Sequence, residues 1–386
     1  MGAQERPRRA DYDPLVERAA TVGSRVLMGP GEPAVSEWAA AGLTLPDLDA
    51  MQHYRLSRIR QRLASEDVAG ALLFDPLNLM YATNSPNMQI WFTHNLDRWV
   101  FVATDGPMVL FDYPACEFLS AHNPLIDEVR PTTCFTYFIA GTRVDEQASA
   151  FAAEIADLVR EHGGGNTRLA VDMIPPAGSN ALIDAGLTLT DGMAVMERAR
   201  AVKGPDEIVA MRCSVEATRV ACGKMFEAMR PGMTEQQVWA VLWAEMLARG
   251  GEWMECRLLV SGPRTNPWFQ ECSSRVILNG DLVAFDTDLV GSYGMMTDIS
   301  RTWMCGDAAP TPQQRHVHDL AVEQVTRNID LLSSSGLPAG MHTGSIGISD
   351  SIASVSPVLA ISEMTRSCEA DASALTRQSP TAIISE

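Results

Sequence analysis

Short apolar runs, separated by longer stretches of mixed polarity, make up the first half of the chain. Four of these runs are bounded by turn residues and predict strands, at 69–75, 99–104, 108–113 and 168–173. The stretches between and around them predict helices, at about 49–65, 144–162 and 177–186. Strands that alternate with helices indicate an α/β domain, which we place at 41–200, after a polar N-terminal arm at 1–40.

The pattern of the second half predicts two helices followed by strands. Pro205 fits a first helical turn, and apolar residues then recur at helical spacing, at Ile208, Met211, Val215, Cys222, Phe226 and Met229. Thr234 fits the cap of a second helix, from about 235 to 248. Further apolar segments predict strands at 256–262, 275–278, 282–290 and 295–304, and a last helix at 312–332. We therefore assign 201–332 to a second domain.

The chain beyond 332 differs in composition from everything before it. Thirteen serines fall within 331–386, and the last aromatic residue of the whole sequence is Trp303. The segment follows neither the strand period nor the helix period. A surface linker has such a composition, and so does GC-rich DNA read in a shifted frame. We favour the second explanation for the tail at 333–386.

Composition excludes several classes of function. The net charge is -18 and no basic stripe is present, so we expect no nucleic-acid partner. No apolar run reaches about 18 residues, so we expect no membrane span. The eight cysteines form no CxxC pair and no secretory signal precedes them, which favours buried thiols in the cytoplasm. A cationic or zwitterionic small substrate is compatible with this charge.

Three aspartates lie in one predicted hairpin. In the strand at 282–290, Asp286 and Asp288 share a face, with alpha carbons about 6.6 Å apart. A turn centred on Tyr293 places Asp298 opposite Asp288, and a slip of two residues places it opposite Asp286. Grouped carboxylates repel one another, and a divalent cation such as Mg, Mn, Fe or Zn removes that cost. The alternative is an acidic surface, but the flanking apolar residues favour a metal site at all three aspartates.

These motifs resemble those of a known enzyme family. KGPDEI at 203–208, RPGMTE at 230–235 and FDTDLVGSYGMMTDISRTW at 285–303 are similar to the creatinase/aminopeptidase-like metalloenzymes of the M24 family, which have the pita-bread fold. The resemblance implies an α/β creatinase-like N-terminal domain and an α+β pita-bread domain, here incomplete at its C-terminal end. It also implies a homodimer and one or two divalent metal ions (Fe, Zn or Mn), with Asp286 and Asp298 at two ligand positions.

Two departures from the family pattern are similar to one branch, the dimethylsulfoniopropionate lyases. Asp288 replaces a glycine, and Trp268 stands where peptidases and creatinases have a histidine. Segments such as SGPRTNPWFQEC at 261–272 and NMQIWFTHN at 87–95 also resemble that branch. The resemblance implies β-elimination of a small zwitterionic sulfonium substrate, with Trp91 and also Trp268 as aromatic walls for the sulfonium. Both tryptophans could instead be core residues, and Arg264 could orient a carboxylate or form a structural pair.

Part of the family's catalytic set has no counterpart in this sequence. The resemblance implies a His-Gly-x-Gly segment near 358–368, a nearby aspartate base and two later glutamate ligands. That region reads VLAISEMTRSC and contains no histidine, so the catalytic base stays unassigned. Two alternatives remain open beside an impaired lyase. One is an M24 metallopeptidase, similar to Xaa-Pro aminopeptidase, or a creatinase-type hydrolase, and the other is a non-catalytic truncated homologue.

Overall fold

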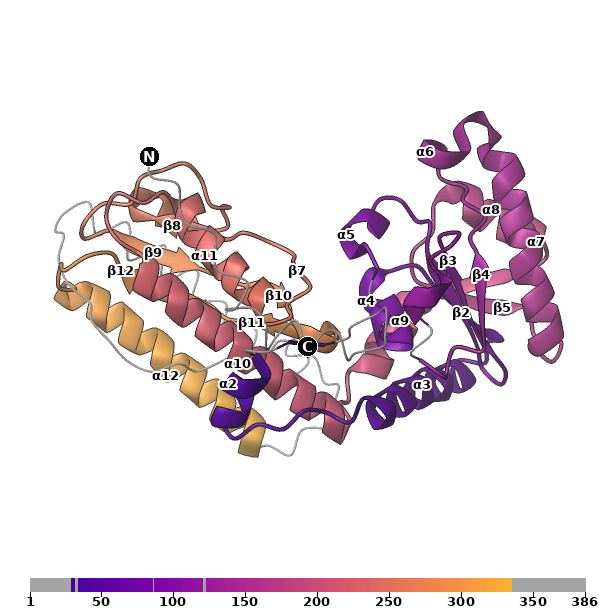
Figure 1. Ribbon diagram of the computed structural model, residues 1–386, viewed down its shortest axis with the longest axis horizontal. Coiled ribbons are helices and arrows are strands. Elements are labelled where there is room, and N and C mark those ends of the chain that lie inside the picture. Colours follow the sequence, from indigo (N-terminus) through magenta and orange to yellow (C-terminus); the bar gives the residue numbers. More distant parts are fainter. Residues whose placement is uncertain (1–28, 32–33, 86, 121–122, 335–386) are drawn as a thin grey trace, which may run out of the picture.

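A mixed six-stranded sheet forms the centre of the first domain (Figure 1). The computed structural model describes residues 29–31, 34–85, 87–120 and 123–334, so the tail from 335 and the arm up to 28 lie outside the described residues. The strand order is β4-β3-β2-β1-β5-β6. β1 pairs antiparallel with β2 and parallel with β5. The strands are β1 (Gly70–Leu73), β2 (Trp99–Ala103), β3 (Met108–Asp112), β4 (Glu128–Pro131), β5 (Arg168–Val171) and β6 (Thr188–Asp191).

Helices cover both faces of this sheet, which explains why its central strands are apolar throughout. Every residue of β1, β2 and β3 is buried. α3 (Leu48–Ser65), α4 (Pro76–Thr83) and α9 (Gly192–Arg200) contribute to the core on one face. α7 (Val144–His162) and α8 (Pro176–Asp184) cover the other face. These bounds confirm the three helices and four strands that the sequence predicts for this domain.

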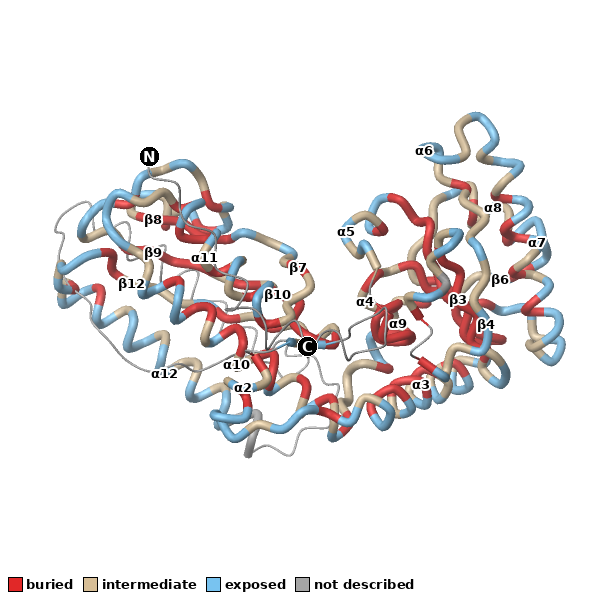
Figure 2. The backbone as a smooth tube through the Cα atoms, in the orientation of Figure 1, coloured by how far each residue is buried: buried red, intermediate tan, exposed pale blue. Residues whose placement is uncertain are grey.

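The second domain packs two long helices against short antiparallel strands. The helices are α10 (Pro205–Ala228) and α11 (Glu235–Ala248), and α12 (Pro312–Ser334) follows the strands. One sheet has the order β11-β10-β7, and the other has the order β12-β9-β8. Figure 2 shows that burial is concentrated in the strands, while α12 is largely exposed or half-buried. The strands are β7 (Trp253–Met254), β8 (Leu259–Ser261), β9 (Leu282–Phe285), β10 (Asp288–Val290), β11 (Met296–Asp298) and β12 (Arg301–Met304).

The start of the second helix follows the sequence prediction closely. Thr234 is the cap of α11, and its hydroxyl accepts a hydrogen bond from the backbone N–H of Gln237 at 3.1 Å. The side chain of Gln237 in turn accepts from the backbone N–H of Thr234 at 2.9 Å. This reciprocal pair satisfies two backbone donors that the first helical turn leaves without partners.

The predicted apolar face of α10 matches its buried face only in part: Cys222 is buried in the core, but most of the large apolar residues are not. Ile208 and Phe226 are 42% and 46% exposed, whereas small residues face the strands. The buried side includes Ala210, Cys213, Ser214, Ala217 and Ala221. Small side chains let the hairpin backbone approach the helix closely, so the hydroxyl of Ser214 donates to the carbonyl of Met295 at 3.1 Å. The large apolar residues that define the pattern in the sequence therefore lie on the flanks of the helix.

Three other expectations need correction. The segment 275–278 forms no strand and contributes one isolated bridge, between Thr234 and Val276. The segment 295–304 divides into β11 and β12, which belong to different sheets. Within the arm, residues 34–40 form the helix α2 (Ala34–Ala40), whose Trp38 is buried in the core of the second domain.

In the part of the chain that the structure describes, no helix has the length and hydrophobicity needed to cross a membrane.

Candidate functional site

A single hairpin carries the three candidate aspartates. Asp288 in β10 lies opposite Asp298 in β11, as a turn centred on Tyr293 predicts. Phe285 in β9 lies opposite Arg301 in β12, so the same register continues through both sheets. The predicted register is therefore confirmed over the whole length of the hairpin.

Thr287 interrupts the ladder between the two sheets. Its side-chain oxygen accepts from the backbone N–H of Ile299 at 2.9 Å and donates to the carbonyl of the same residue at 3.3 Å. The side chain thus takes the place of a backbone partner, and the hairpin divides into two short ladders. Asp286 lies at this break, where it accepts a hydrogen bond from the hydroxyl of Ser300 at 2.6 Å.

The structure pairs two of the aspartates across the strands and gives the third a different cross-strand neighbour. Asp288 and Asp298 are half-buried cross-strand partners, while Asp286 faces Ser300. The thiol of Cys256 donates to Asp288 at 3.0 Å, and burial together with this hydrogen bond raises the pKa of Cys256 to about 12. Within the described residues, no three His, Cys, Asp or Glu side chains are placed so that they could hold a metal ion together.

Two glutamates next to this hairpin escaped the sequence analysis. Burial raises the pKa of Glu252 to about 7, although a hydrogen bond from the backbone of Gly294 opposes the shift. Burial also raises the pKa of Glu255, and the charge of Asp288 adds to that shift. Both glutamates lie close to Trp253 in the sequence, and no spacing rule assigns a role to either of them.

Trp268 lies in a core cluster on the second domain. Its side chain is 9% exposed and packs with Leu258, Val260 and Ala284. Ala284 lies on the same face of the strand as Asp286. The indole of Trp268 therefore covers an apolar part of the face that carries Asp286. This position agrees with the core alternative for Trp268.

Trp91 lies on the first domain, in the short helix α5 (Gln89–Phe92). Its indole N–H donates to the hydroxyl of Tyr113 at 3.2 Å, and that hydroxyl donates to the buried carboxylate of Asp97 at 3.2 Å. Gln89 of the same helix donates to Glu252 at 3.1 Å, so α5 contacts the second domain. No ring contact among the described residues joins Trp91 to Trp268, so the structure does not assemble the two into one aromatic wall.

Arg264 forms a structural ion pair. It contacts the carboxylate of Glu235, which is fully buried. The same carboxylate accepts hydrogen bonds from the backbone and hydroxyl of both Ser261 and Ser273, at 2.7 to 2.9 Å. These donors and Arg264 together stabilise the buried charge of Glu235, which links α11 to the segments that carry Ser261 and Ser273.

Comparison with known families and structures agrees with this two-domain architecture. Residues 55–202 match the creatinase/prolidase N-terminal domain, and residues 209–347 match metallopeptidase family M24. The Xaa-Pro dipeptidase of Bacillus anthracis superposes with a TM-score of 0.54 at 20% identity, covering 70% of this chain and 69% of that one. This likeness confirms the creatinase-like N-terminal domain and the pita-bread fold of the second domain.

Two curated relatives are much closer in sequence. The dimethylsulfoniopropionate lyase DddP of Roseovarius nubinhibens is 49% identical over 327 residues, 82% of this chain and 73% of the relative. DddP of Roseobacter denitrificans is 46% identical over the same length and shares. The Xaa-Pro aminopeptidase of Escherichia coli is 24% identical over 314 residues, 74% of this chain and 69% of that protein. The chain therefore belongs to the M24 metallopeptidase family and, within it, to the group that contains DddP.

Proposed function

We propose that this protein is a lyase that cleaves dimethylsulfoniopropionate to dimethyl sulfide and acrylate. The observation that carries the proposal is the 49% identity to a DddP enzyme over 82% of the chain. The replacement of a histidine by Trp268 supports it, because a hydrolase of the same fold would lose a proton carrier there. In the reaction a base removes the proton next to the substrate carboxylate. The C–S bond then breaks and dimethyl sulfide leaves with the electron pair.

We further propose that Asp286, Asp288 and Asp298 ligate a divalent metal ion, either Fe, Zn or Mn, in one or two copies. The donors fit such an ion, because these are hard oxygen ligands and two of them face each other across the hairpin. In the described residues these three carboxylates are not grouped as a metal site, so the proposal requires Asp286 to move toward Asp288 and Asp298 when the ion binds. When bound, the ion would stabilise negative charge on the substrate carboxylate.

Trp91 is our proposed binding surface for the sulfonium. An indole face attracts a cation with about 1–2 kcal/mol when water is excluded. The hydrogen bond from Trp91 to Tyr113, and from Tyr113 to the buried Asp97, fixes the orientation of the indole. Trp268 could add a second apolar surface near Asp286. We also propose that the protein is a homodimer, which light scattering of the purified chain would test, and that it acts in the cytoplasm, which cell fractionation would test.

Headspace gas chromatography of the full chain with dimethylsulfoniopropionate tests the lyase proposal. We expect dimethyl sulfide and an equal amount of acrylate, together with bound metal measured by mass spectrometry. Asp298→Asn should lower both metal content and product at least tenfold, while Asp307→Asn, at an exposed position outside the hairpin, should change neither. Release of amino acids from an Xaa-Pro peptide would favour the hydrolase alternative. A folded protein without metal or product would favour the non-catalytic one.

A further inference from the structure

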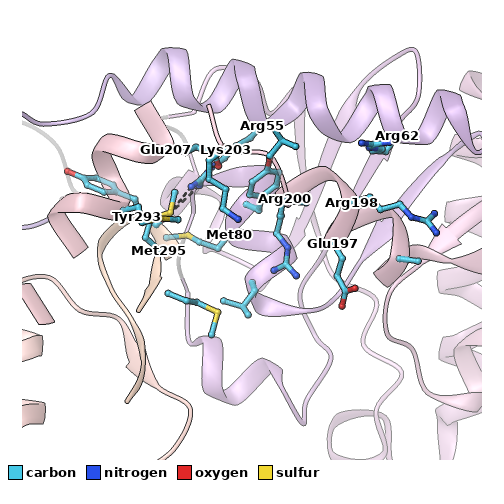
Figure 3. Close-up of a pocket in the computed structure, with 18 residues that line it drawn as sticks. Arg55, Arg62, Met80, Glu197, Arg198, Arg200, Lys203, Glu207, Tyr293 and Met295 are labelled. Atoms are coloured by element: carbon cyan, nitrogen blue, oxygen red, sulfur yellow. Dashed lines mark hydrogen bonds and ion pairs between the residues drawn. The ribbon is translucent and has the colours of Figure 1, made fainter. Parts of the chain in front are cut away.

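A cavity of about 590 Å³ lies between the two domains (Figure 3), and its lining includes neither Asp286 nor Trp91. The first domain contributes residues from α3, α4 and α9 together with the segment that joins α9 to α10. The second domain contributes α10 and the tip of the hairpin. A cavity of this size accommodates a small organic molecule.

The lining carries more positive than negative charge, although the whole chain has a net charge of -18. Its cations are Arg55, Arg62, Arg198, Arg200 and Lys203, and its acids are Glu197 and Glu207. Two of the cations are neutralised by ion pairs. Arg55 lies 2.8 Å from Glu207, and Arg198 lies 2.6 Å from Glu66.

Two other arginines keep donors available. Among the described residues, the buried Nε of Arg62 has no hydrogen-bond partner. Arg200 has no side-chain ion pair among those residues, although its charge opposes the rise in the pKa of Glu255. Figure 3 shows the guanidinium of Arg200 extending among the lining side chains, whereas that of Arg198 points away from them. A half-buried guanidinium without a carboxylate in direct contact favours an anion, which it can bind through two parallel hydrogen bonds.

The rest of the lining is apolar and adaptable. Met80, Met211, Met295 and Met296 line the same cavity. Methionine is unbranched and polarisable, so a wall of several methionines fits an aliphatic chain of variable shape. The cavity therefore combines a cationic side with an apolar side, which is the complement of an anionic amphiphile.

We propose that this interdomain cavity binds a small organic anion, a carboxylate with an aliphatic chain. The carboxylate pairs with Arg200, and the chain packs on the methionines. Because Arg200 belongs to α9 and two of the methionines to the hairpin, the ligand holds the two domains together and stabilises the folded protein. The inference does not depend on the lyase function.

Isothermal titration calorimetry and thermal unfolding of the full chain with octanoate test the inference. We expect saturable binding and a rise in Tm, and at least tenfold weaker binding in Arg200→Gln. That variant should fold, because the half-buried Arg200 forms no direct ion pair among the described residues that the substitution would break. Arg160→Gln, at a side chain that is 73% exposed on α7, is the matched control and should bind as the wild type does. Met296→Ser should weaken octanoate binding while leaving the fold intact.

Comparing octanoate with smaller anions tests whether binding needs both the cationic side and the apolar side of the cavity. Acetate and inorganic phosphate should bind much more weakly than octanoate, because neither contacts the apolar wall. Equal affinity for acetate and octanoate would overturn the proposal, and so would octanoate binding that Arg200→Gln leaves unchanged. Displacement of octanoate by dimethylsulfoniopropionate would show that the cavity is the site of that zwitterion, which also overturns it. None of these outcomes requires enzymatic activity, so a failure here is distinct from a failure of the lyase assay.

Discussion

The substitution Glu252→Gln should make the folded protein less sensitive to pH. Glu252 lies just before β7, where its carboxyl accepts a hydrogen bond from Gln89 of the first domain at 3.1 Å. Burial raises its pKa from 4.5 to about 7, which outweighs a hydrogen bond from Gly294 and the positive charge of Arg55. Glutamine has nearly the same shape and can accept the same hydrogen bonds, but it carries no charge at any pH.

The direction of this pH dependence follows from how many protons the folded and the unfolded state bind. Between pH 4.5 and 7 the folded state keeps a proton that the unfolded state has released, so the free energy of unfolding falls as pH rises. The shift corresponds to about 3 kcal/mol, and partial solvent access reduces this to about 2 kcal/mol. Glu252→Gln avoids the loss, so it should match the wild type near pH 4.5 and exceed its stability by about 2 kcal/mol at pH 8.

Urea unfolding of both proteins at half-unit steps from pH 4.5 to pH 8 measures this difference. Other groups that titrate in the window, such as Asp172 with its pKa raised to about 6 by burial, are present in both proteins and cancel in the difference. Glu161→Gln, at a side chain that is 73% exposed, provides the control and should show no such trend. A difference between wild type and Glu252→Gln that stays constant with pH would refute the reasoning.

Three further substitutions test the packing around the site by urea unfolding. Gly291→Ala should cost about 1–3 kcal/mol, because its Cβ would lie 1.7 Å from the hydroxyl of Ser214, and adding Ser214→Ala should recover part of that loss. Thr234→Ala should cost about 1 kcal/mol by removing the cap of α11, and an unchanged midpoint would contradict this assignment. Glu235→Ala should cost about 3–5 kcal/mol, because it leaves the charge of Arg264 without its partner.

Features that depend on local geometry could be predicted from the sequence. The register of the hairpin follows from its turn at Gly291–Gly294, because strand pairing on both sides of a fixed turn is determined by that turn. The start of α11 follows from the cap at Thr234, which acts within one helical turn. The strands of the first domain follow from apolar runs that are buried on both faces.

Features that depend on distant partners could not be predicted. The buried face of α10 is set by how closely the hairpin approaches, and the small residue Ser214 gives no hydrophobic signal. The break in the hairpin depends on the side chain of Thr287 bonding to Ile299 across the ladder. The raised pKa of Glu252 depends on burial by the hairpin and by Gln89 from the other domain, which are all distant in sequence.

The hairpin that carries the aspartates is positioned by the first domain as well as by its own sheet. Arg55 of α3 forms a buried ion pair with Glu207 of α10, and its guanidinium also donates to the backbone carbonyl of Tyr293 at the hairpin tip. Tyr293 has a φ of 65°, a conformation that a tyrosine adopts only when its surroundings impose it. Because a buried cation without its partner costs several kcal/mol, Arg55 keeps both contacts. The interface between the domains thus supports the conformation of the turn whose local geometry pairs Asp288 with Asp298.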